Sequence, residues 1–212
     1  MNHSHVRTNY DRMSRFYDLF AGTSERRFTG VGLQMLAAQA GENVLEIGFG
    51  TGHSLVALAQ AVGGFGKVTG IDISKGMLRV TQSRLNQSGL AEQIDLRLGD
   101  AASLPFNSAG FEAVFMSFTL ELFDLPEIPI VLKECRRVLR PGGRIGVVAL
   151  AKKDKAAVRI YEWAHAKFPD FIDCRPIYVH FVLEKAGFHI SERAERIMWG
   201  LPVQIMVAQK SP

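Results

Sequence analysis

The chain of 212 residues has few of the features that mark secreted, metal-binding or membrane-spanning proteins. It contains only two cysteines, Cys135 and Cys174, which are too few for a disulfide framework and are not spaced as metal ligands. No run approaches the roughly 20 apolar residues of a membrane-spanning helix, and the polar stretch 1–10 lacks the apolar core of a secretion signal. We therefore expect a cytoplasmic protein without a metal centre, for which any membrane contact is peripheral.

Long runs of one charge are also missing. The net charge is +4 and the pI is near 9.2, yet basic residues come at most in pairs such as Arg26-Arg27 and Arg136-Arg137. Nucleic-acid-binding proteins concentrate basic residues on one face or in one segment. The sequence therefore favours no nucleic-acid partner, and a mild attraction to anionic surfaces or substrates stays open.

The residues that are present alternate between strand-like and helix-like segments. Apolar residues make up 47% of the chain and charged residues 22%, as in ordinary globular domains, and this length suits one core better than two. We expect strands at 43–46, 67–72, 94–98, 111–117, 144–150, 188–198 and 202–208, and helices at 54–62, 74–88, 127–139, 154–168 and 176–186. The short link 199–201 permits only an antiparallel pair of final strands. Strands that alternate with helices predict a doubly wound α/β sheet.

Several helix ends have specific signals. Ser74 has the character of an N-cap, and Gly89 is expected to end the helix that follows it. The run Pro141-Gly142-Gly143 is expected to stop the helix at 127–139, and Gly187 to close the helix at 176–186.

A glycine-rich turn, 48–52, directly follows the first predicted strand. Its three glycines at alternate positions predict a wide turn free of side chains, because glycine adopts positive φ and lets the backbone approach a ligand. Asp72 lies twenty positions later at the end of the second strand, where a carboxylate can accept both hydroxyls of a ribose. A nicotinamide dinucleotide is disfavoured, since His53 stands near the place where the pyrophosphate fingerprint needs its third glycine. The spacing therefore predicts a pocket for a nucleoside cofactor.

Polar or small residues follow each of the first four strands. These are the turn 48–52, Asp72, Asp100 and the stretch 117–121. In a doubly wound sheet, ligands bind where the parallel strands end. Four motifs from separate parts of the sequence therefore converge on one predicted site.

These residues resemble the class I S-adenosylmethionine-dependent methyltransferases. The resemblance rests on Glu46-x-Gly48-x-Gly50-x-Gly52, on Asp72 with Met77, on Gly99-Asp100-Ala101 before Leu104-Pro105-Phe106, and on Arg137-Val138-Leu139-Arg140-Pro141-Gly142-Gly143. Within that superfamily the chain is most similar to the branch with the ubiquinone and menaquinone biosynthesis C-methyltransferases and the bacterial phospholipid N-methyltransferases. The resemblance covers residues 7–150 and is only topological beyond them.

The resemblance implies a Rossmann-like, seven-stranded mixed sheet of strand order 3-2-1-4-5-7-6, whose last strand is antiparallel. We expect one methyltransferase domain over 1–212. Its parts are N-terminal cap helices at 1–38, a cofactor-binding core at 39–150, a substrate lid at 151–187 and a terminal β-hairpin at 188–212.

The resemblance also implies which residues contact S-adenosylmethionine and its product S-adenosylhomocysteine. Asp72 would hold the ribose, Glu46 would lie near the amino group, and Asp100 would accept from the adenine amine. The whole implied set is Tyr10, Tyr17, Glu46, Gly48, Phe49, Gly50, Thr51, Gly52, Asp72, Ile73, Met77, Asp100, Ala101, Ser117 and Phe118. The two tyrosines belong to an N-terminal cap and either face the sulfonium through their rings or pack on the core.

Candidate groups on the acceptor side are less specific. Methyl transfer is an in-line displacement, so a base is needed only if the acceptor must lose a proton. Glu121, His165 and His180 are the candidates for an acceptor contact or base, although surface histidines are common. The aromatic-rich segment 151–175 predicts apolar walls around the acceptor.

We therefore expect transfer of a methyl group to a small or lipid-like apolar acceptor. Two alternatives stay open: an N-methyltransferase for phospholipids or small amines, and a regulatory module that binds S-adenosylmethionine without turnover. The run Tyr10-Asp11-Arg12-Met13-Ser14-Arg15 keeps only the beginning of the quinone-branch signature, which weakens the quinone assignment but none of the cofactor contacts.

Overall fold

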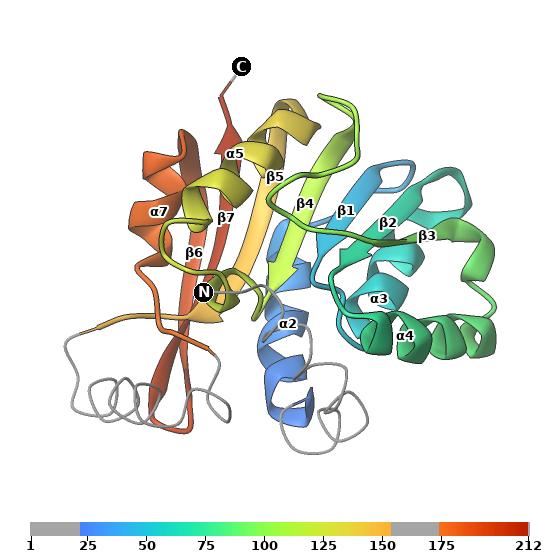
Figure 1. The fold of residues 1–212 in the computed structure, drawn as a ribbon, viewed down its shortest axis with the longest axis horizontal. Coiled ribbons are helices and arrows are strands. Elements are labelled where there is room, and N and C mark those ends of the chain that lie inside the picture. Colours follow the sequence, from blue (N-terminus) through green and yellow to red (C-terminus); the bar gives the residue numbers. More distant parts are fainter. Residues whose placement is uncertain (1–21, 154–173, 212) are drawn as a thin grey trace.

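A seven-stranded sheet organises the molecule (Figure 1). The structure is a computed structural model, and it describes residues 22–153 and 174–211. The strands are β1 (Asn43–Ile47), β2 (Lys67–Asp72), β3 (Ile94–Leu98), β4 (Phe111–Ser117), β5 (Leu139–Leu150), β6 (Phe188–Met198) and β7 (Leu201–Lys210). Their order is β3-β2-β1-β4-β5-β7-β6, and β7 is antiparallel to both neighbours. The predicted fold and strand order are confirmed.

Helices cover both faces of the sheet (Figure 1). They are α2 (Gly22–Leu36), α3 (His53–Val62), α4 (Lys75–Ser88), α5 (Ile128–Val138) and α7 (Val179–Lys185), with the short 3-10 turn η3 (Leu120–Leu122) after β4. One buried cluster contains apolar residues of α2, α3 and α4, and a second contains those of α5 and α7. Each helix buries one apolar stripe, as Leu55, Leu58 and Val62 do on α3. None of the described helices has the length and apolar character needed to cross a bilayer.

The parallel strands β1 to β5 all end at one edge of the sheet, called here the carboxyl edge. The β6–β7 hairpin turns at that same edge, because Met198 pairs with Leu201 and Leu150 at the end of β5 pairs with Val203. Trp199 and Gly200 both have positive φ, of 51° and 82°, as in the two-residue turns that match strand twist. The predicted antiparallel hairpin is therefore present.

The helix α5 ends within one residue of the predicted 127–139 and before Pro141-Gly142-Gly143, as predicted. It stops at Val138, and Leu139 already has the extended φ and ψ of −69° and 137°. The strand that follows begins earlier than the predicted 144, because Leu139 is fully buried and pairs with Phe111 as the first residue of β5. Pro141, Gly142 and Gly143 form an irregular part of β5, where the register with β4 shifts.

The helix α7 is shorter than the predicted 176–186. Ile177 forms a parallel bridge with Ala151 and its N–H donates to the Leu150 carbonyl at 3.0 Å, which keeps the chain extended until Tyr178. The helix ends before Gly187, whose φ is 83°, as predicted. The predicted helix at 154–168 lies outside the described residues.

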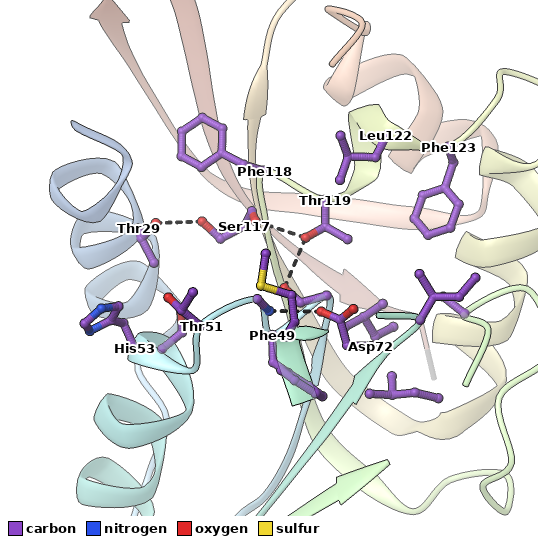
Figure 2. Close-up of a pocket in the computed structure, with 18 of the residues that line it drawn as sticks. Thr29, Phe49, Thr51, His53, Asp72, Ser117, Phe118, Thr119, Leu122 and Phe123 are labelled. Atoms are coloured by element: carbon purple, nitrogen blue, oxygen red, sulfur yellow. Dashed lines mark hydrogen bonds between the residues drawn. The ribbon is translucent and has the colours of Figure 1, made fainter. Parts of the chain in front are cut away.

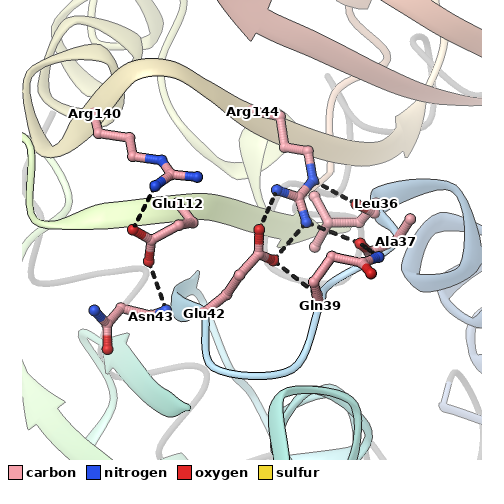
Figure 3. A network of polar contacts seen from close by, with 8 residues as sticks. All are labelled: Leu36, Ala37, Gln39, Glu42, Asn43, Glu112, Arg140 and Arg144. Atoms are coloured by element: carbon pink, nitrogen blue, oxygen red, sulfur yellow. Dashed lines mark hydrogen bonds and ion pairs between the residues drawn. The ribbon is translucent and has the colours of Figure 1, made fainter. Parts of the chain in front are cut away.

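A polar clamp fixes the end of α2 at the opposite, amino edge of the sheet (Figure 3). Arg144 donates from Nε to the Leu36 carbonyl at 2.6 Å and from Nη2 to the Ala37 carbonyl at 2.9 Å. Its Nη1 and Nη2 also donate to the two Glu42 carboxylate oxygens, at 2.9 and 2.7 Å. Burial raises the pKa of Glu42, but the bonds from Arg144 and from the Gln39 N–H outweigh burial and lower that pKa below its usual value. The clamp positions the first half of α2 at the carboxyl edge.

Candidate active site

A pocket lies at the carboxyl edge, where four loops and one helix meet (Figure 2). The loops follow β1, β2, β3 and β4, and the helix is α2. The lining residues are 25–26, Thr29, 47–51, 53–54, 71–73, Met77, 99–101, 117–119, 122–123 and Glu127. The predicted convergence of four motifs therefore forms a real cavity.

The three glycines of the turn have different physical roles. All have positive φ: 72° at Gly48, 50° at Gly50 and 81° at Gly52. A Cβ on Gly48 would lie 2.4 Å from Thr119 Cγ2, and one on Gly52 would lie 2.6 Å from Thr81 Cγ2. A Cβ on Gly50 would meet nothing within 4 Å. Gly48 and Gly52 thus allow tight packing, whereas Gly50 keeps space open in the pocket.

Asp72 is held rigidly beside this turn. Its Oδ2 accepts from the Gly50 N–H at 3.0 Å (Figure 2). Its Oδ1 accepts from the Ser74 N–H at 2.9 Å. Thr81 Oγ1 donates to the Gly50 carbonyl at 2.8 Å and ties the turn to α4. Each carboxylate oxygen can accept more than one hydrogen bond. The carboxylate is therefore oriented in advance and retains the capacity to accept from a pair of hydroxyls.

A slot with apolar walls adjoins Asp72. Met77 and Ala101 are almost fully buried and line it together with Ile73. Asp100 Oδ1 accepts from the Ala102 N–H at 2.8 Å, which fixes the loop after β3. Such a slot, with a carboxylate at its rim, suits a flat heteroaromatic ring that carries an amino group.

Glu46 lies behind the glycine turn, outside the lining of the pocket. Its side chain is 2% exposed and forms a hydrogen bond with Ser54, which does line the pocket. Its Oε2 has no hydrogen-bond partner among the described residues. Burial raises the pKa of Glu46 well above its usual value, the Asp72 charge adds to that effect, and the Ser54 bond opposes it. Ser54 therefore links the Glu46 carboxylate to the lining of the pocket.

The opposite wall of the pocket is largely apolar. Phe118, Leu122 and Phe123 line it (Figure 2). Phe118 has a φ of 50°, unusual for a bulky residue, and its N–H donates to the Val148 carbonyl at 2.7 Å. Ser117 Oγ lies 2.7 Å from Thr29 Oγ1, so a hydroxyl pair joins β4 to α2.

The prediction did not include the pocket residues contributed by α2, by the last residue of η3 and by the chain after it. These are Glu25, Arg26, Thr29, Leu122, Phe123 and Glu127, whereas Thr119 lies within the predicted stretch 117–121. Leu122 and Phe123 lie directly beyond the stretch 117–121 that was singled out, so extending that stretch finds them. No local motif marks Thr29, because its role depends on Ser117, 88 residues away.

Two of the three candidate acceptor-side groups, Glu121 and His180, do not line the described pocket. Glu121 is 1% exposed, and its Oε1 accepts from the Leu150 N–H at 2.9 Å. Its main-chain carbonyl accepts from the Arg175 N–H at 3.1 Å, so Glu121 joins η3 to the end of β5 and to residue 175. His180 lies half-exposed on α7 with Nε2 3.2 Å from Glu184 Oε1, and it does not line the pocket. His165, Tyr10 and Tyr17 lie outside the described residues.

The remaining predicted cofactor residues do line the pocket, with one exception. Phe49, Thr51, Ser117 and Phe118 are in its wall, whereas Gly52 packs against Thr81. His53, the first residue of α3, also lines it. Within the described part of the chain, no group of three or more His, Cys, Asp or Glu side chains could hold a metal ion.

Comparison with known sequences identifies the family. Residues 44–143 match the family model described as "Methyltransferase domain". The chain is 32% identical to the demethylmenaquinone methyltransferase of Lactiplantibacillus plantarum, over 76% of this chain and 67% of that protein. It is 30% identical to the demethylmenaquinone methyltransferase of Lactobacillus johnsonii, over 78% of this chain and 66% of that protein. It is also 35% identical to the 2-phytyl-1,4-naphtoquinone methyltransferase of Synechococcus elongatus, over 59% of this chain and 53% of that protein. The chain thus spans between about half and two thirds of the length of these relatives.

Solved structures agree on the fold. A putative methyltransferase of Haloferax volcanii, solved in a complex with the Trm112 methyltransferase activator, has a TM-score of 0.80 at 17% identity, with 98% of each chain covered. The [4+2]-cyclase SpnF has a TM-score of 0.76 at 19% identity, with 97% of this chain and 95% of that chain covered. Likeness at these identities shows the fold alone, since one fold carries different reactions. From the sequence relatives, the family model and the glycine turn with Asp72, we conclude that the chain belongs to the class I S-adenosylmethionine-dependent methyltransferases.

Proposed function

We propose that this protein transfers a methyl group from S-adenosylmethionine to a small or lipid-like apolar acceptor. The observation that supports this most directly is the division of one pocket into two unlike walls. One wall presents backbone amides and two fixed carboxylates, and the other presents Phe118, Leu122 and Phe123. The first suits a polar nucleoside, and the second suits an apolar acceptor.

The residues of the first wall fit the cofactor of the family. Asp72 would hold the ribose hydroxyls, since both its oxygens are already oriented by main-chain N–H groups. Met77 and Ile73 would flank the adenine, with Asp100 near its amino group. Gly50 leaves the space that the bound nucleoside needs. The bound cofactor would supply a methyl group on a positively charged sulfur.

The chain itself has to orient the two reactants and keep water out. In-line displacement depends on collinear alignment of the nucleophile, the methyl carbon and the sulfur, so positioning supplies much of the rate acceleration. The apolar wall of 118 and 122–123 excludes water from that line. The pair Thr29–Ser117 fixes the distance between α2 and β4 on one side of the pocket.

We further propose an electron-rich aromatic lipid, such as a reduced quinone, as the acceptor. The names of the curated relatives support this class, and an aromatic ring suits a wall of two phenylalanines. Phospholipid or small-amine N-methylation is the alternative acceptor chemistry. A regulatory module that only binds the cofactor is the alternative without turnover.

A turnover screen tests the proposal. Purified protein is incubated with S-adenosylmethionine and either a reduced demethylated menaquinone, phosphatidylethanolamine vesicles or small primary amines, and release of S-adenosylhomocysteine is followed. We expect release with the reduced quinone only, and its loss in Asp72→Ala. Release with the lipid or the amines instead would replace the quinone with an N-acceptor. Cofactor binding without release for any acceptor would support the regulatory module.

A further inference from the structure

Four large apolar side chains that stay exposed lie at the carboxyl edge: Leu125 before α5, Tyr178 before α7, and Ile197 and Trp199 at the β6–β7 turn. The other exposed ones are Ile130 on α5, Phe181 on α7, Leu98 on the outer strand β3 at the far side of the sheet, and Phe65 before β2 at the opposite edge. Single exposed apolar residues are normal, but a gathering at one edge marks an interaction surface. The same edge contains the pocket.

The β6–β7 turn is the most pronounced part of this surface. Trp199 is 67% exposed and Ile197 is 63% exposed. Trp199 has a φ of 51° at the first position of a turn that favours asparagine or glycine there. Neither the turn geometry nor burial in the core explains a tryptophan at this position, which points to a role in binding. Residues 196–200 are called here the hairpin tip.

Arginines outnumber glutamates near the hairpin tip, although Glu192 and Glu195 alternate with Arg193 and Arg196 along β6 and Glu195 pairs with Lys153. Arg196 is exposed, and among the described residues it donates only to the Glu195 carbonyl, at 2.8 Å. Arg193 on the same strand and Arg175 beside the end of β5 form no ion pair with a described residue. Each exposed arginine close to an anionic lipid surface adds favourable electrostatic energy.

We propose that the hairpin tip docks on the surface of an anionic phospholipid bilayer. Trp199 and Ile197 enter the interfacial region, where tryptophan is favoured because its ring is apolar and its N–H is polar. Arg196 lies against the phosphate groups. The Ala151 N–H donates to the Pro202 carbonyl at 2.8 Å, which ties the base of the hairpin tip to the end of β5, so docking brings the pocket edge to the membrane.

The docking itself does not depend on the proposed function. The inference that docking delivers a lipid-like acceptor to the pocket does rest on it. Binding to vesicles without any acceptor therefore separates the two proposals. If vesicles bind and no acceptor is methylated, the docking stands and the proposed function fails.

Co-sedimentation with vesicles tests the docking. Wild type is compared with the double variant Ile197→Ser/Trp199→Ser, with Arg196→Gln, and with Phe65→Ser as a matched aromatic control on the opposite edge. Vesicles are made of phosphatidylcholine with or without phosphatidylglycerol. We expect wild type and Phe65→Ser to bind the anionic vesicles equally, and the double variant to bind about tenfold or more weakly. Arg196→Gln should weaken binding to the anionic vesicles and reduce its dependence on salt.

Two further measurements complete the test. Calorimetric affinity for S-adenosylmethionine should be equal in wild type and the double variant, which shows that the variant is folded. Sedimentation velocity reports whether Ile197 and Trp199 instead join two copies of the chain. The proposal is overturned if wild type binds neither vesicle, if the folded double variant binds as well as wild type, or if the wild type forms a dimer that the double variant loses.

Discussion

The two walls of the pocket are built in different ways. On the cofactor wall, the fixing contacts are local: Asp72 bonds Ser74 and Gly50, and Thr81 bonds Gly50, all within 31 residues. On the acceptor wall, the fixing contact joins residues 88 apart, since Thr29 on α2 meets Ser117 at the end of β4. The cofactor wall is therefore built by consecutive elements from β1 to the loop after β3, and the acceptor wall is a property of the assembled fold.

The two walls should therefore differ in how well they tolerate amino-acid substitutions. A wall made of main-chain amides and short loops tolerates little change, because its geometry depends on backbone positions. A wall made of side chains from α2 and from the segment 117–123 can change by substitution without disturbing the cofactor. Substitutions in the two walls should consequently affect different kinetic constants.

The largest effect is expected from Gly50→Val, which breaks the cofactor wall. The branched side chain would enter the space that Gly50 leaves open, so affinity for S-adenosylmethionine should fall about 100-fold or more, or about 2.7 kcal/mol. Gly89→Val is the control, because Gly89 also has positive φ and no neighbour within 4 Å of a Cβ but lies outside the pocket. If calorimetry shows that both variants lose affinity for S-adenosylmethionine equally, the effect comes from backbone strain instead.

Asp72→Ala should have the next largest effect on the same wall. Loss of hydrogen bonds to a charged group should weaken cofactor binding by roughly 1.5 to 3 kcal/mol and leave the acceptor KM unchanged. Asp95→Ala removes a carboxylate that pairs with Arg97 on β3, away from the pocket, and should change neither quantity. Unchanged affinity in Asp72→Ala would remove the ribose assignment.

Glu121→Ala addresses the acceptor side. The substitution leaves the buried Leu150 N–H without its acceptor, so the free energy of unfolding should fall by about 1–3 kcal/mol. The acceptor KM should rise, because Glu121 joins η3, next to Leu122 and Phe123, to the end of β5. Glu121→Gln keeps an oxygen at Oε1, so its free energy of unfolding and its acceptor KM should both be close to those of the wild type. Denaturant unfolding measures the first and steady-state kinetics the second. A variant Glu121→Gln as impaired as Glu121→Ala would mean that the charge itself is needed.

Thr29→Val should give a smaller change on the same wall. The isosteric substitution removes the 2.7 Å hydroxyl contact with Ser117, at a cost of about 0.5–1.5 kcal/mol in stability. We expect the acceptor KM to rise and the cofactor affinity to stay within error. If titration instead shows the cofactor affinity falling with the acceptor KM unchanged, the two walls are not independent.

The smallest effect is expected away from both walls, at Glu42. The pKa of Glu42 is lower in the folded protein than its usual value of 4.5, because Arg144 and the Gln39 N–H stabilise the carboxylate against burial. Its stabilising contribution is therefore complete above about pH 4.5 and is lost as the pH falls through the lower folded pKa. The difference in unfolding free energy between wild type and Glu42→Gln should thus shrink in acid, as urea midpoints over pH can show. Glu92→Gln, on an exposed residue, serves as the control.

Much of the fold was predictable because its signals are local. The ends of β2, β3, β4 and β6 agree with the predicted bounds, and Ser74 accepts from the Met77 N–H at 3.2 Å as an N-cap should. The start of β5 was not predictable in this way, since Leu139 pairs with Phe111 on β4 before the predicted start at 144. This pairing joins residues 28 positions apart and includes Pro141-Gly142-Gly143 in the strand.

The residues of the candidate site fall into the same two groups, those that local signals predict and those whose role depends on distant contacts. Asp72, Met77 and Asp100 were found from the sequence, because each lies at a fixed distance from the end of a strand. Glu121 was read as an acceptor contact, but its position next to Leu150 turns the carboxylate away from the pocket lining. A carboxylate after a strand has the same local sequence in either role, and only its neighbours in space decide between them.

The sequence by itself determined the alternation of strands and helices and the cofactor wall, because these follow from spacings at the ends of successive strands. The family and the order of the strands followed from the resemblance of several motifs taken together. The tertiary structure decided the acceptor wall, the roles of Thr29 and Glu121, and the exposure of Trp199 at the carboxyl edge. Those features depend on contacts between segments far apart in the chain, and no local pattern of residues encodes which distant side chain will pack against them.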